Sequence, residues 1–543
     1  MDMILFNGRI ATMDAGNPEA SAVLIRDGRF EYVGDDLEVM ALADSDTRIL
    51  DLMGRFVCPG FNDSHLHLLN YAYGLTKVDC GGAASVDEII ERARHFLEAH
   101  PVKPGQWILG RGWNQTFFNN QQELTRHDLD RISTDHPISF TRVCEHVTVA
   151  NSKAIEMLGI TKETPQPEGG RFDVDHEGNP TGVFRETARY MIYEAIEEAD
   201  LESIKKMLIK ASEIMSSYGI TSVQTDDFET FAGKDYELIL RAYHELIDEG
   251  KLGVRIYEQC LLSSPDRLQR FLDAGYLTGQ GNEFFRIGPL KLLADGSLGA
   301  RTAYLTEPYA DAPETSGLPV FSQSELDNLV ISAHVSGMQV ALHAIGDKTI
   351  YMCFESFEKA QQKFFREDPR FSIIHVQITD EPLLKKFAEQ QVIANVQPIA
   401  LDNDLHIVEN RVGKDRAAFT YHYRTLIDLG APVALSSDCP VDSVDPLKNI
   451  YAAVTRQDLN GEPPGGWMPE EKLTIHQALY ALTMGAAYAS YEENLKGSIE
   501  PGKLADLTVL SENPFAVPET GLLKIRVDMT MMNGNIVYTR EGQ

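Results

Sequence analysis

The order of hydrophobic and polar residues predicts β-structure at both ends of the chain. Near the start, MILFNGRIAT and SAVLIRDGRFEYVG alternate apolar stretches with turn residues, and Asp27-Gly28 is typical of a hairpin. The last residues repeat this pattern, with GSIEPGKLADLTVL followed by VDMTMMNGNIVYTREG and a second hairpin signal at Asn533-Gly534. Both ends are therefore expected to form sheet.

From about residue 201 the pattern alternates between helix-length and strand-length segments. Apolar residues at 201, 204, 208, 211 and 215 mark one helical face, Gly219 ends it, and ITSVQT follows as a buried strand. The cycle recurs through VRIYEQ, RIGPLKLL, QVALH, FSIIHV, VIANV and PVALSS. With RFVCPGFND near the start, these runs make eight candidate strands, which predict a TIM-like (β/α)8 barrel of the α/β class.

One gap in this rhythm is too long for a loop between neighbouring strands. His67 and Ile220 lie 153 residues apart, so we expect an inserted subdomain that covers the substrate. The predicted organisation is a composite β-sandwich from residues 1–57 and 491–543, barrel strand 1 in 58–79, the insertion in 80–200, and the rest of the barrel in 201–490.

Composition excludes several classes of protein. The chain has 49 Lys and Arg against 81 Asp and Glu, a net charge of −32, which disfavours a nucleic-acid partner. No apolar run approaches the roughly 20 residues of a membrane span, and MDMILFNGRI turns polar too soon for a signal peptide. The six cysteines form no CxxC pair, which indicates neither disulfides nor a thiolate zinc finger. We therefore expect a soluble cytoplasmic protein.

Candidate chemistry begins in the run FNDSHLHLL. His65 and His67 lie two residues apart after a strand that starts near Phe56, so both imidazoles can face the same side and reach one metal ion. A single HxH pair is weak evidence, because most such pairs bind no metal.

Three more ligand-type residues lie at the ends of later predicted strands. QVALH ends in His343, FSIIH ends in His375, and PVALSS runs into Asp438. For either histidine alone, a buried core residue is the favoured explanation. Active sites of barrels form at the carboxyl ends of the strands, so the set as a whole predicts a metal site.

Lys291, in GPLKLLADGS, belongs to the same set of strand ends. A buried lysine is costly, and the simpler explanation is an ion pair with Asp295. The alternative is that a lysine with a lowered pKa takes up carbon dioxide, and that the resulting carboxylate bridges two metals about 3.5–4 Å apart. The sequence leaves both explanations open.

The chain resembles the amidohydrolase superfamily of metal-dependent hydrolases over almost its whole length. The resemblance rests on PGFNDSHLHL, the later single histidines, SSDCPV and the tail GSIEPGKLADLTVL. GWNQTFF, EHVTVANSKA, GVFRETA, KLLADGSLGARTAYL and ALHAIGD are similar to its YtcJ-like branch, which includes N-substituted formamide deformylases. The resemblance implies two zinc ions, held by His65, His67 and Asp438, by His343 and His375, and by a carboxylated Lys291 that bridges them.

The implied reaction is hydrolysis of an amide-type or formamide-type carbon–nitrogen bond by a metal-activated hydroxide. Asp438 and Lys291 are the predicted catalytic residues, with Asp438 taking the proton of water and returning it to the leaving nitrogen. The HxxE pattern of the superfamily's nucleobase deaminases is absent, because His343 is followed by AIGD. This argues against a deaminase.

Five further residues fall in family-like motifs and are predicted to line the substrate pocket or to orient the oxyanion. They are Trp113, His146, Asn151, Glu186 and Arg301, and structural roles are equally plausible for each. Glu186 could also replace Lys291 as the bridging carboxylate.

Two residues depart from the family pattern: Asn62 stands where an apolar residue is usual, and Cys439 stands where Ala is commoner. We favour a packing role for Cys439 over metal ligation.

Several alternatives stay open. A mononuclear N-acyl amino acid deacylase would hold one divalent metal per chain, zinc or another. A non-catalytic regulatory relative would have lost the metal, against which the complete ligand set argues. A metal-free barrel that binds sugars or phosphates would need a Gly-rich loop near the last strands, and none is evident. Formamides, N-acyl compounds and cyclic amides all remain candidate substrates, and a homodimer is the default assembly.

Overall fold

The computed structural model describes residues 2–119 and 121–540 and divides into two compact units. The main unit comprises Met1–Tyr71 and Leu201–Gln543, and the inserted unit comprises Ala72–Asp200. The predicted insertion of residues 80–200 lies wholly within the inserted unit, which begins eight residues earlier.

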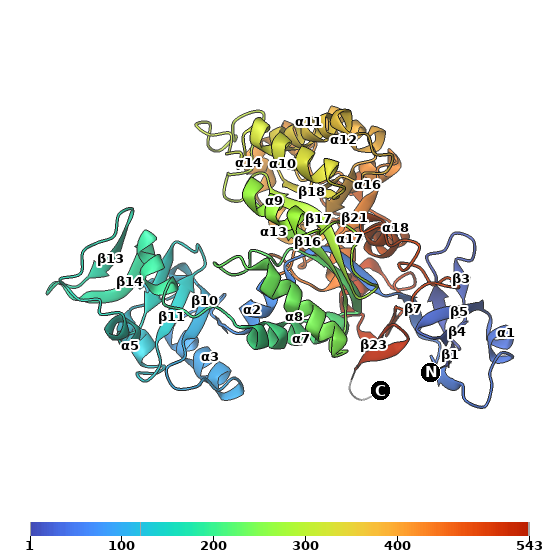
Figure 1. The fold of residues 1–543 in the computed structure, drawn as a ribbon, viewed down its shortest axis with the longest axis horizontal. Helices are drawn as coiled ribbons and strands as arrows, with labels where there is room; N and C mark the ends of the chain where they lie inside the picture. The colour runs from blue at the N-terminus through green and yellow to red at the C-terminus, as the bar shows by residue number, and fades with distance from the viewer. Residues whose placement is uncertain (1, 120, 541–543) are drawn as a thin grey trace. The chain divides into compact units, whose positions relative to one another are not determined.

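The main unit contains the predicted parallel barrel, nearly closed (Figure 1). Its eight strands are neighbours in chain order: β8 (Phe61–Leu66), β15 (Ile220–Thr225), β16 (Arg255–Leu261), β17 (Phe285–Leu293), β18 (Val340–Ala344), β19 (Ser372–His375), β20 (Ile393–Val396) and β21 (Val433–Leu435). Between β21 and β8, Ser64 Oγ donates a hydrogen bond of 2.7 Å to the carbonyl of Leu435, and Asp438 N–H donates one of 3.0 Å to that of His65.

Helices follow the barrel strands as the sequence periodicity predicts (Figure 1). The main ones are α7 (Leu201–Ser217), α8 (Tyr236–Asp248), α9 (Pro265–Asp273), α10 (Gln323–Val335), α11 (Asp347–Lys363), α12 (Glu381–Glu389), α16 (Tyr423–Asp428) and α17 (Pro446–Thr455). In α7 the residues of the predicted apolar face from Ile204 onward are buried. This face packs on the barrel and stabilises it mainly by burying apolar surface.

The first barrel strand differs from the expectation. Phe56–Pro59 forms a separate strand, β7, which belongs to a sheet of the chain ends, and the barrel strand β8 starts only at Phe61. The chain changes sheet at Gly60, where a side chain would not fit because a Cβ would lie 2.2 Å from Thr221 Oγ1. His65 therefore lies within β8, and His67 directly follows it.

Both chain ends form sheet, as predicted. One four-stranded sheet has the order β5-β4-β1-β6, and a six-stranded sheet of order β24-β23-β22-β7-β2-β3 combines the N- and C-terminal segments. Their strands are β1 (Met3–Phe6), β2 (Arg9–Ala11), β3 (Glu19–Ala20), β4 (Ala22–Arg26), β5 (Arg29–Gly34), β6 (Arg48–Asp51), β22 (Leu507–Leu510), β23 (Val527–Met532) and β24 (Asn535–Thr539). Val23, Phe30, Val509 and Met531 share one hydrophobic core. The predicted hairpin turns join β4 to β5 and β23 to β24, and Asp27, Gly28, Asn533 and Gly534 all have positive φ there.

The inserted unit is built on a mixed sheet of order β13-β14-β12-β11-β10-β9. Its strands are β9 (Val78–Asp79), β10 (Ile108–Trp113), β11 (Ile138–Arg142), β12 (Val147–Ala150), β13 (Gly170–Val174) and β14 (Pro180–Glu186), and its longest helix is α3 (Val86–Ala99). Trp113 and Phe140 belong to its own hydrophobic core.

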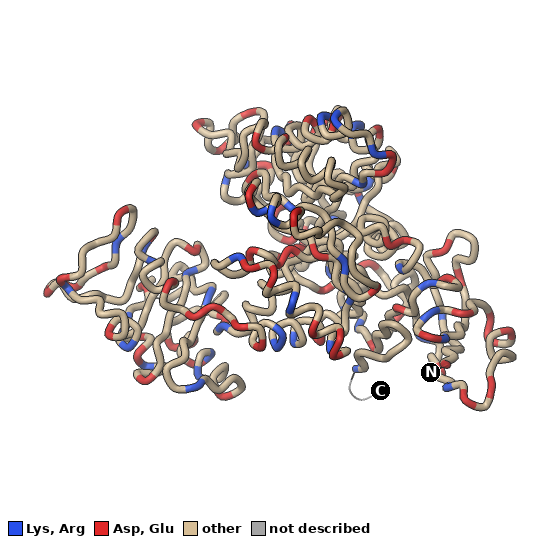
Figure 2. Tube along the Cα trace, in the orientation of Figure 1, with Lys and Arg blue, Asp and Glu red and all other residues tan. Residues whose placement is uncertain are grey.

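The Asp and Glu residues that produce the net charge of −32 are spread along the whole Cα trace (Figure 2). None of the helices in the described residues is both long enough and apolar enough to span a membrane.

Candidate metal centre

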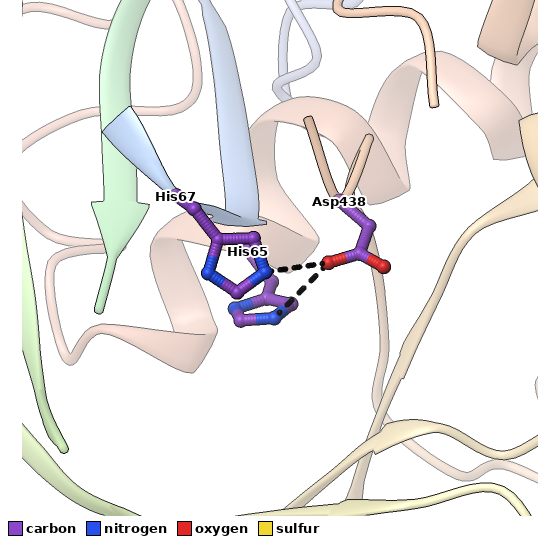
Figure 3. A group of neighbouring side chains, drawn as sticks. All are labelled: His65, His67 and Asp438. Atoms are coloured by element: carbon purple, nitrogen blue, oxygen red, sulfur yellow. Dashed lines mark hydrogen bonds and ion pairs between the residues drawn. The ribbon is translucent and has the colours of Figure 1, made fainter. Parts of the chain in front are cut away.

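Two neighbouring chain segments bring three ligand-type side chains together at the carboxyl end of the barrel. His65 is on β8 and His67 follows it, while Asp438 lies three residues after β21. Their side chains point toward one another (Figure 3). Asp438 Oδ1 lies 3.4 Å from Nε2 of His65 and 3.1 Å from Nε2 of His67. One ligand atom from each residue lies within 4.8 Å of the others, a spacing that can hold a metal ion.

The second ring nitrogen of each imidazole has its own partner. His65 Nδ1 donates a hydrogen bond of 2.8 Å to Gln259 Oε1, and His67 Nδ1 donates one to Asp226 Oδ1. These contacts fix the rings so that both Nε2 atoms face Asp438. Metal-binding histidines are commonly oriented in this way.

His343 and His375 lie beside this group. Their ring centroids are 4.4 Å apart, and the ring of His375 is 5.9 Å from that of His65. His375 Nδ1 donates a hydrogen bond of 2.9 Å to Gln397 Oε1. A cavity of about 440 Å³ is lined by His65, His67, His343, His375 and Asp438 among other residues.

Lys291 is fully buried beside the same group. Its Nζ donates a hydrogen bond of 3.1 Å to His65 Nε2 and lies 3.3 Å from Asp226 Oδ2. Lys291 thus pairs with Asp226 and not with Asp295, the partner suggested by the simpler of the two open explanations. The Asp295 carboxylate instead accepts hydrogen bonds from the N–H groups of Tyr304, Ile345 and Gly346. Burial lowers the pKa of Lys291, although Asp226 and Asp438 act in the opposite direction.

The electrostatics of the three-residue group suit a divalent cation. Burial and nearby Lys291 keep the pKa of His65 well below its usual value, so its Nε2 is unprotonated and has an electron pair that could bind a metal. Burial also lowers the pKa of His67, but Asp226 and Asp438 outweigh it and raise the value to about 10. Burial raises the pKa of Asp438, but His67 and His375 bring it below its usual value. A strong negative field therefore surrounds His67 Nε2, the position at which a metal would replace the proton.

Two of the predicted substrate-contacting residues are buried within the inserted unit. Trp113 Nε1 donates a hydrogen bond of 3.0 Å to the carbonyl of Phe140. Asn151 caps α5 (Ser152–Met157), where its Oδ1 accepts the N–H of Ala154 at 3.0 Å. Both therefore have structural roles in this unit, and a contact with substrate stays a prediction.

The other three predicted substrate-contacting residues are accessible or partly so. His146 and Glu186 form an exposed pair in the inserted unit, with 2.8 Å between Nδ1 and Oε2. Arg301, in the main unit, pairs with Asp311 at 2.8 Å. Their roles toward substrate, and that of Glu186 as a bridging carboxylate, stay predictions.

The sequence patterns missed Asp226, Gln259 and Gln397, which orient the predicted ligands. Asp226 directly follows β15, Gln259 lies near the end of β16, and Gln397 directly follows β20. All three thus lie at the carboxyl ends of strands, the same signal that identified the histidines. A search of every strand end for hydrogen-bond acceptors could have found them.

Cys439 is buried next to Asp438, and its carbonyl accepts the N–H of His67 at 2.8 Å. Its backbone therefore positions one of the predicted ligands. A packing role for its thiol stays a prediction.

Known proteins are similar to this chain over nearly its whole length. The model of a family described as "Amidohydrolase family" matches residues 48–538. YtcJ of Bacillus subtilis is 33% identical over 541 residues, which cover 99% of this chain and 100% of YtcJ. An N-substituted formamide deformylase of Arthrobacter pascens is 28% identical, over a match that covers 100% of this chain and 99% of the deformylase.

A solved structure has the same fold. The crystal structure of an uncharacterized metal-dependent hydrolase from Pyrococcus horikoshii OT3 has a TM-score of 0.79 and 31% sequence identity. The match covers 96% of this chain and 99% of that one. The likeness therefore includes the barrel, the sheets of the chain ends and the insertion.

Proposed function

Because the chain belongs to the amidohydrolase family, we propose that it is a metal-dependent hydrolase that cleaves the carbon–nitrogen bond of an amide or formamide. The observation that carries this proposal is the convergence of His65, His67 and Asp438 on one point, with the rings oriented by Gln259 and Asp226. The similarity to a formamide deformylase supports formamides as the first substrates to test.

We propose that His65, His67 and Asp438 hold one zinc ion. We further propose that His343, His375 and a carboxylated Lys291 complete a second position. When bound, the metal supplies a Lewis acid that acidifies water and polarises the carbonyl of the substrate.

Side chains of the protein then accept the proton of water and return it to the leaving nitrogen. The pKa of Asp438 is below its usual value, so its carboxylate is ionised at neutral pH and can accept a proton from water. The same carboxyl can return that proton to the leaving nitrogen. Asp226 and Gln259 keep the imidazoles fixed while this occurs.

A mononuclear enzyme, such as an N-acyl amino acid deacylase, is the second candidate. It is favoured by one observation: the three-residue group of His65, His67 and Asp438 includes neither His343 nor His375. The metal content of the protein separates the two candidates, because a mononuclear site holds one ion per chain.

The proposal is tested by elemental analysis and hydrolysis assays on protein purified with zinc and bicarbonate. We expect one or two zinc ions per chain and release of formate from N-alkylformamides, which a chelator abolishes and zinc restores. His65→Asn should lose metal and activity. His95→Asn is the matched control, because His95 is exposed on α3. Full activity of the metal-free protein, or no hydrolysis of any amide by the zinc-loaded protein, would contradict the proposal.

A further inference from the structure

The cavity that contains the candidate metal ligands also presents two carboxylates that the proposed reaction does not use. Asp404, at the end of α13 (Leu401–Asp404), and Asp442, in the segment after β21, both line it. Neither belongs to the three-residue metal group.

These carboxylates have few partners. Asp404 Oδ2 accepts hydrogen bonds from Tyr421 Oη at 2.8 Å and from Gln377 Nε2 at 3.3 Å. Asp442 Oδ1 accepts one long hydrogen bond of 3.4 Å from Asn403. Among the described residues, no hydrogen bond reaches Oδ1 of Asp404 or Oδ2 of Asp442. Each carboxylate therefore keeps one oxygen for a further donor.

Among the described residues that line the cavity there is no Lys or Arg, and no positively charged side chain makes a hydrogen bond or ion pair with Asp404 or Asp442. Burial, together with Asp438, Asp404 and Asp402, raises the pKa of Asp442 to about 7, which shows how poorly its charge is compensated. A bound group with positive charge would relieve this repulsion.

The cavity wall also offers apolar surface to an organic ligand. Leu293 and Val441 also line the cavity and are 40% and 69% exposed, so they offer apolar surface to an alkyl chain.

We infer that the substrate is an amide or formamide whose alkyl arm ends in an ammonium group, and that Asp404 and Asp442 bind this group. The inference rests on the proposed function, which it refines by naming a substrate class. A metal ion is a poorer fit for these two carboxylates, because among the described residues no third ligand joins either of them. An ammonium group needs only the two open carboxylate oxygens and contributes three N–H donors.

The test compares two isosteric substrates, N-(4-aminobutyl)formamide, which is cationic, and N-pentylformamide, which is neutral, with their shorter and longer homologues. We expect the zinc-loaded protein to prefer the cationic compound in kcat/KM by about tenfold or more at pH 8. Asp404→Asn and Asp442→Asn should each bring the ratio of kcat/KM values for the cationic and neutral compounds close to one. Calorimetry with both compounds gives a second readout that does not require turnover.

Asp402→Asn is the matched control, because it removes the same charge from a neighbouring residue outside the cavity lining. An equal loss of preference in this variant would show a general field effect and overturn the inference. Equal kcat/KM values for the two substrates in the unmodified protein would also overturn it, while leaving the proposed hydrolase function supported. If neither compound is hydrolysed although other amides are, the inference is overturned and the proposed function stands. If no amide is hydrolysed, the proposed function fails, and equal binding of both compounds by calorimetry would overturn the inference as well.

Discussion

Asp226 accepts a hydrogen bond from Nδ1 of His67, although the two residues lie 159 positions apart in the sequence. Asp226 follows β15 and His67 follows β8, and these two strands are neighbours in the barrel. The same carboxylate lies 3.3 Å from Nζ of Lys291. One side chain therefore orients a predicted ligand of the first metal position and contacts the residue predicted to bridge to the second.

Replacing Asp226 should weaken metal binding without removing a ligand. In Asp226→Asn the side chain keeps its size, but the imidazole of His67 loses a charged partner. We expect the affinity for zinc to fall about 10–100-fold, measured by competition with a chelator of known affinity. Glu245→Gln is the control, since Glu245 pairs with Lys205 on the helices outside the barrel. Unchanged affinity in Asp226→Asn would show that this contact does not orient the ring.

Asp438→Asn should abolish most of the turnover. The amide cannot accept a proton from water, and general acid–base groups contribute about 10²–10⁴-fold to rates. We expect kcat to fall by that factor for any substrate that the protein hydrolyses. Elemental analysis of the same sample separates this effect from loss of the metal. Full turnover in this variant would exclude Asp438 as the proton acceptor.

The sequence predicted the barrel because short apolar runs of strand length recur along the chain, separated by helix-length amphipathic segments. It predicted the positions of His343, His375 and Asp438 because the end of an apolar run locates the end of a strand to within a few residues. The sequence could not predict which residues these side chains contact. Whether Lys291 meets Asp295 or Asp226 depends on the register of neighbouring strands and on the path of the loop after β17, which local patterns do not contain.

The break between β7 and β8 was missed for a similar reason. RFVCPGFND is one apolar run, and only the contact of Gly60 with Thr221, more than 150 residues later, shows why the chain changes sheet there. Nothing in the sequence marks the orienting residues Gln259 and Gln397, because their role depends on hydrogen bonds to His65 and His375 that only the structure shows.

Asn62 offers a test of stability that does not involve chemistry. Its side chain is 2% exposed, and both amide atoms lack a hydrogen-bond partner among the described residues. An unpaired buried polar group costs about 1–3 kcal/mol, so Asn62→Leu should raise the free energy of unfolding by about 1 kcal/mol, measured by denaturant titration. Asn395→Leu is the matched control and should destabilise the protein, because the Asn395 amide bonds to Ser64 and Ser436. A less stable Asn62→Leu variant would indicate that the amide has a partner in solution.

The preference for cationic substrates should depend on pH in a defined direction. The pKa of Asp442 is raised to about 7 by burial and by the neighbouring carboxylates, so its side chain is mostly neutral at pH 6 and mostly ionised at pH 8. The ratio of kcat/KM values for the cationic and neutral formamides should therefore rise severalfold between these pH values. Taking the ratio cancels the pH dependence that both substrates share. Asp442→Asn should show a flat ratio, and a flat ratio in the unmodified protein would contradict the role of Asp442.

The chemical state of Lys291 should determine whether the chain binds one or two zinc ions. Its amine is fully buried with a lowered pKa, so a larger neutral fraction can add to carbon dioxide and release one proton to give a carbamate. We expect zinc-depleted protein reconstituted with zinc and bicarbonate to bind nearly two ions per chain, and about one without bicarbonate. Lys291→Gln should bind about one in both cases. Carbon-13-labelled bicarbonate should give a carbamate resonance in the unmodified protein that Lys291→Gln lacks. One ion per chain in the unmodified protein under both conditions, without that resonance, would instead favour the mononuclear enzyme, with Lys291 held by Asp226 as a simple buried cation.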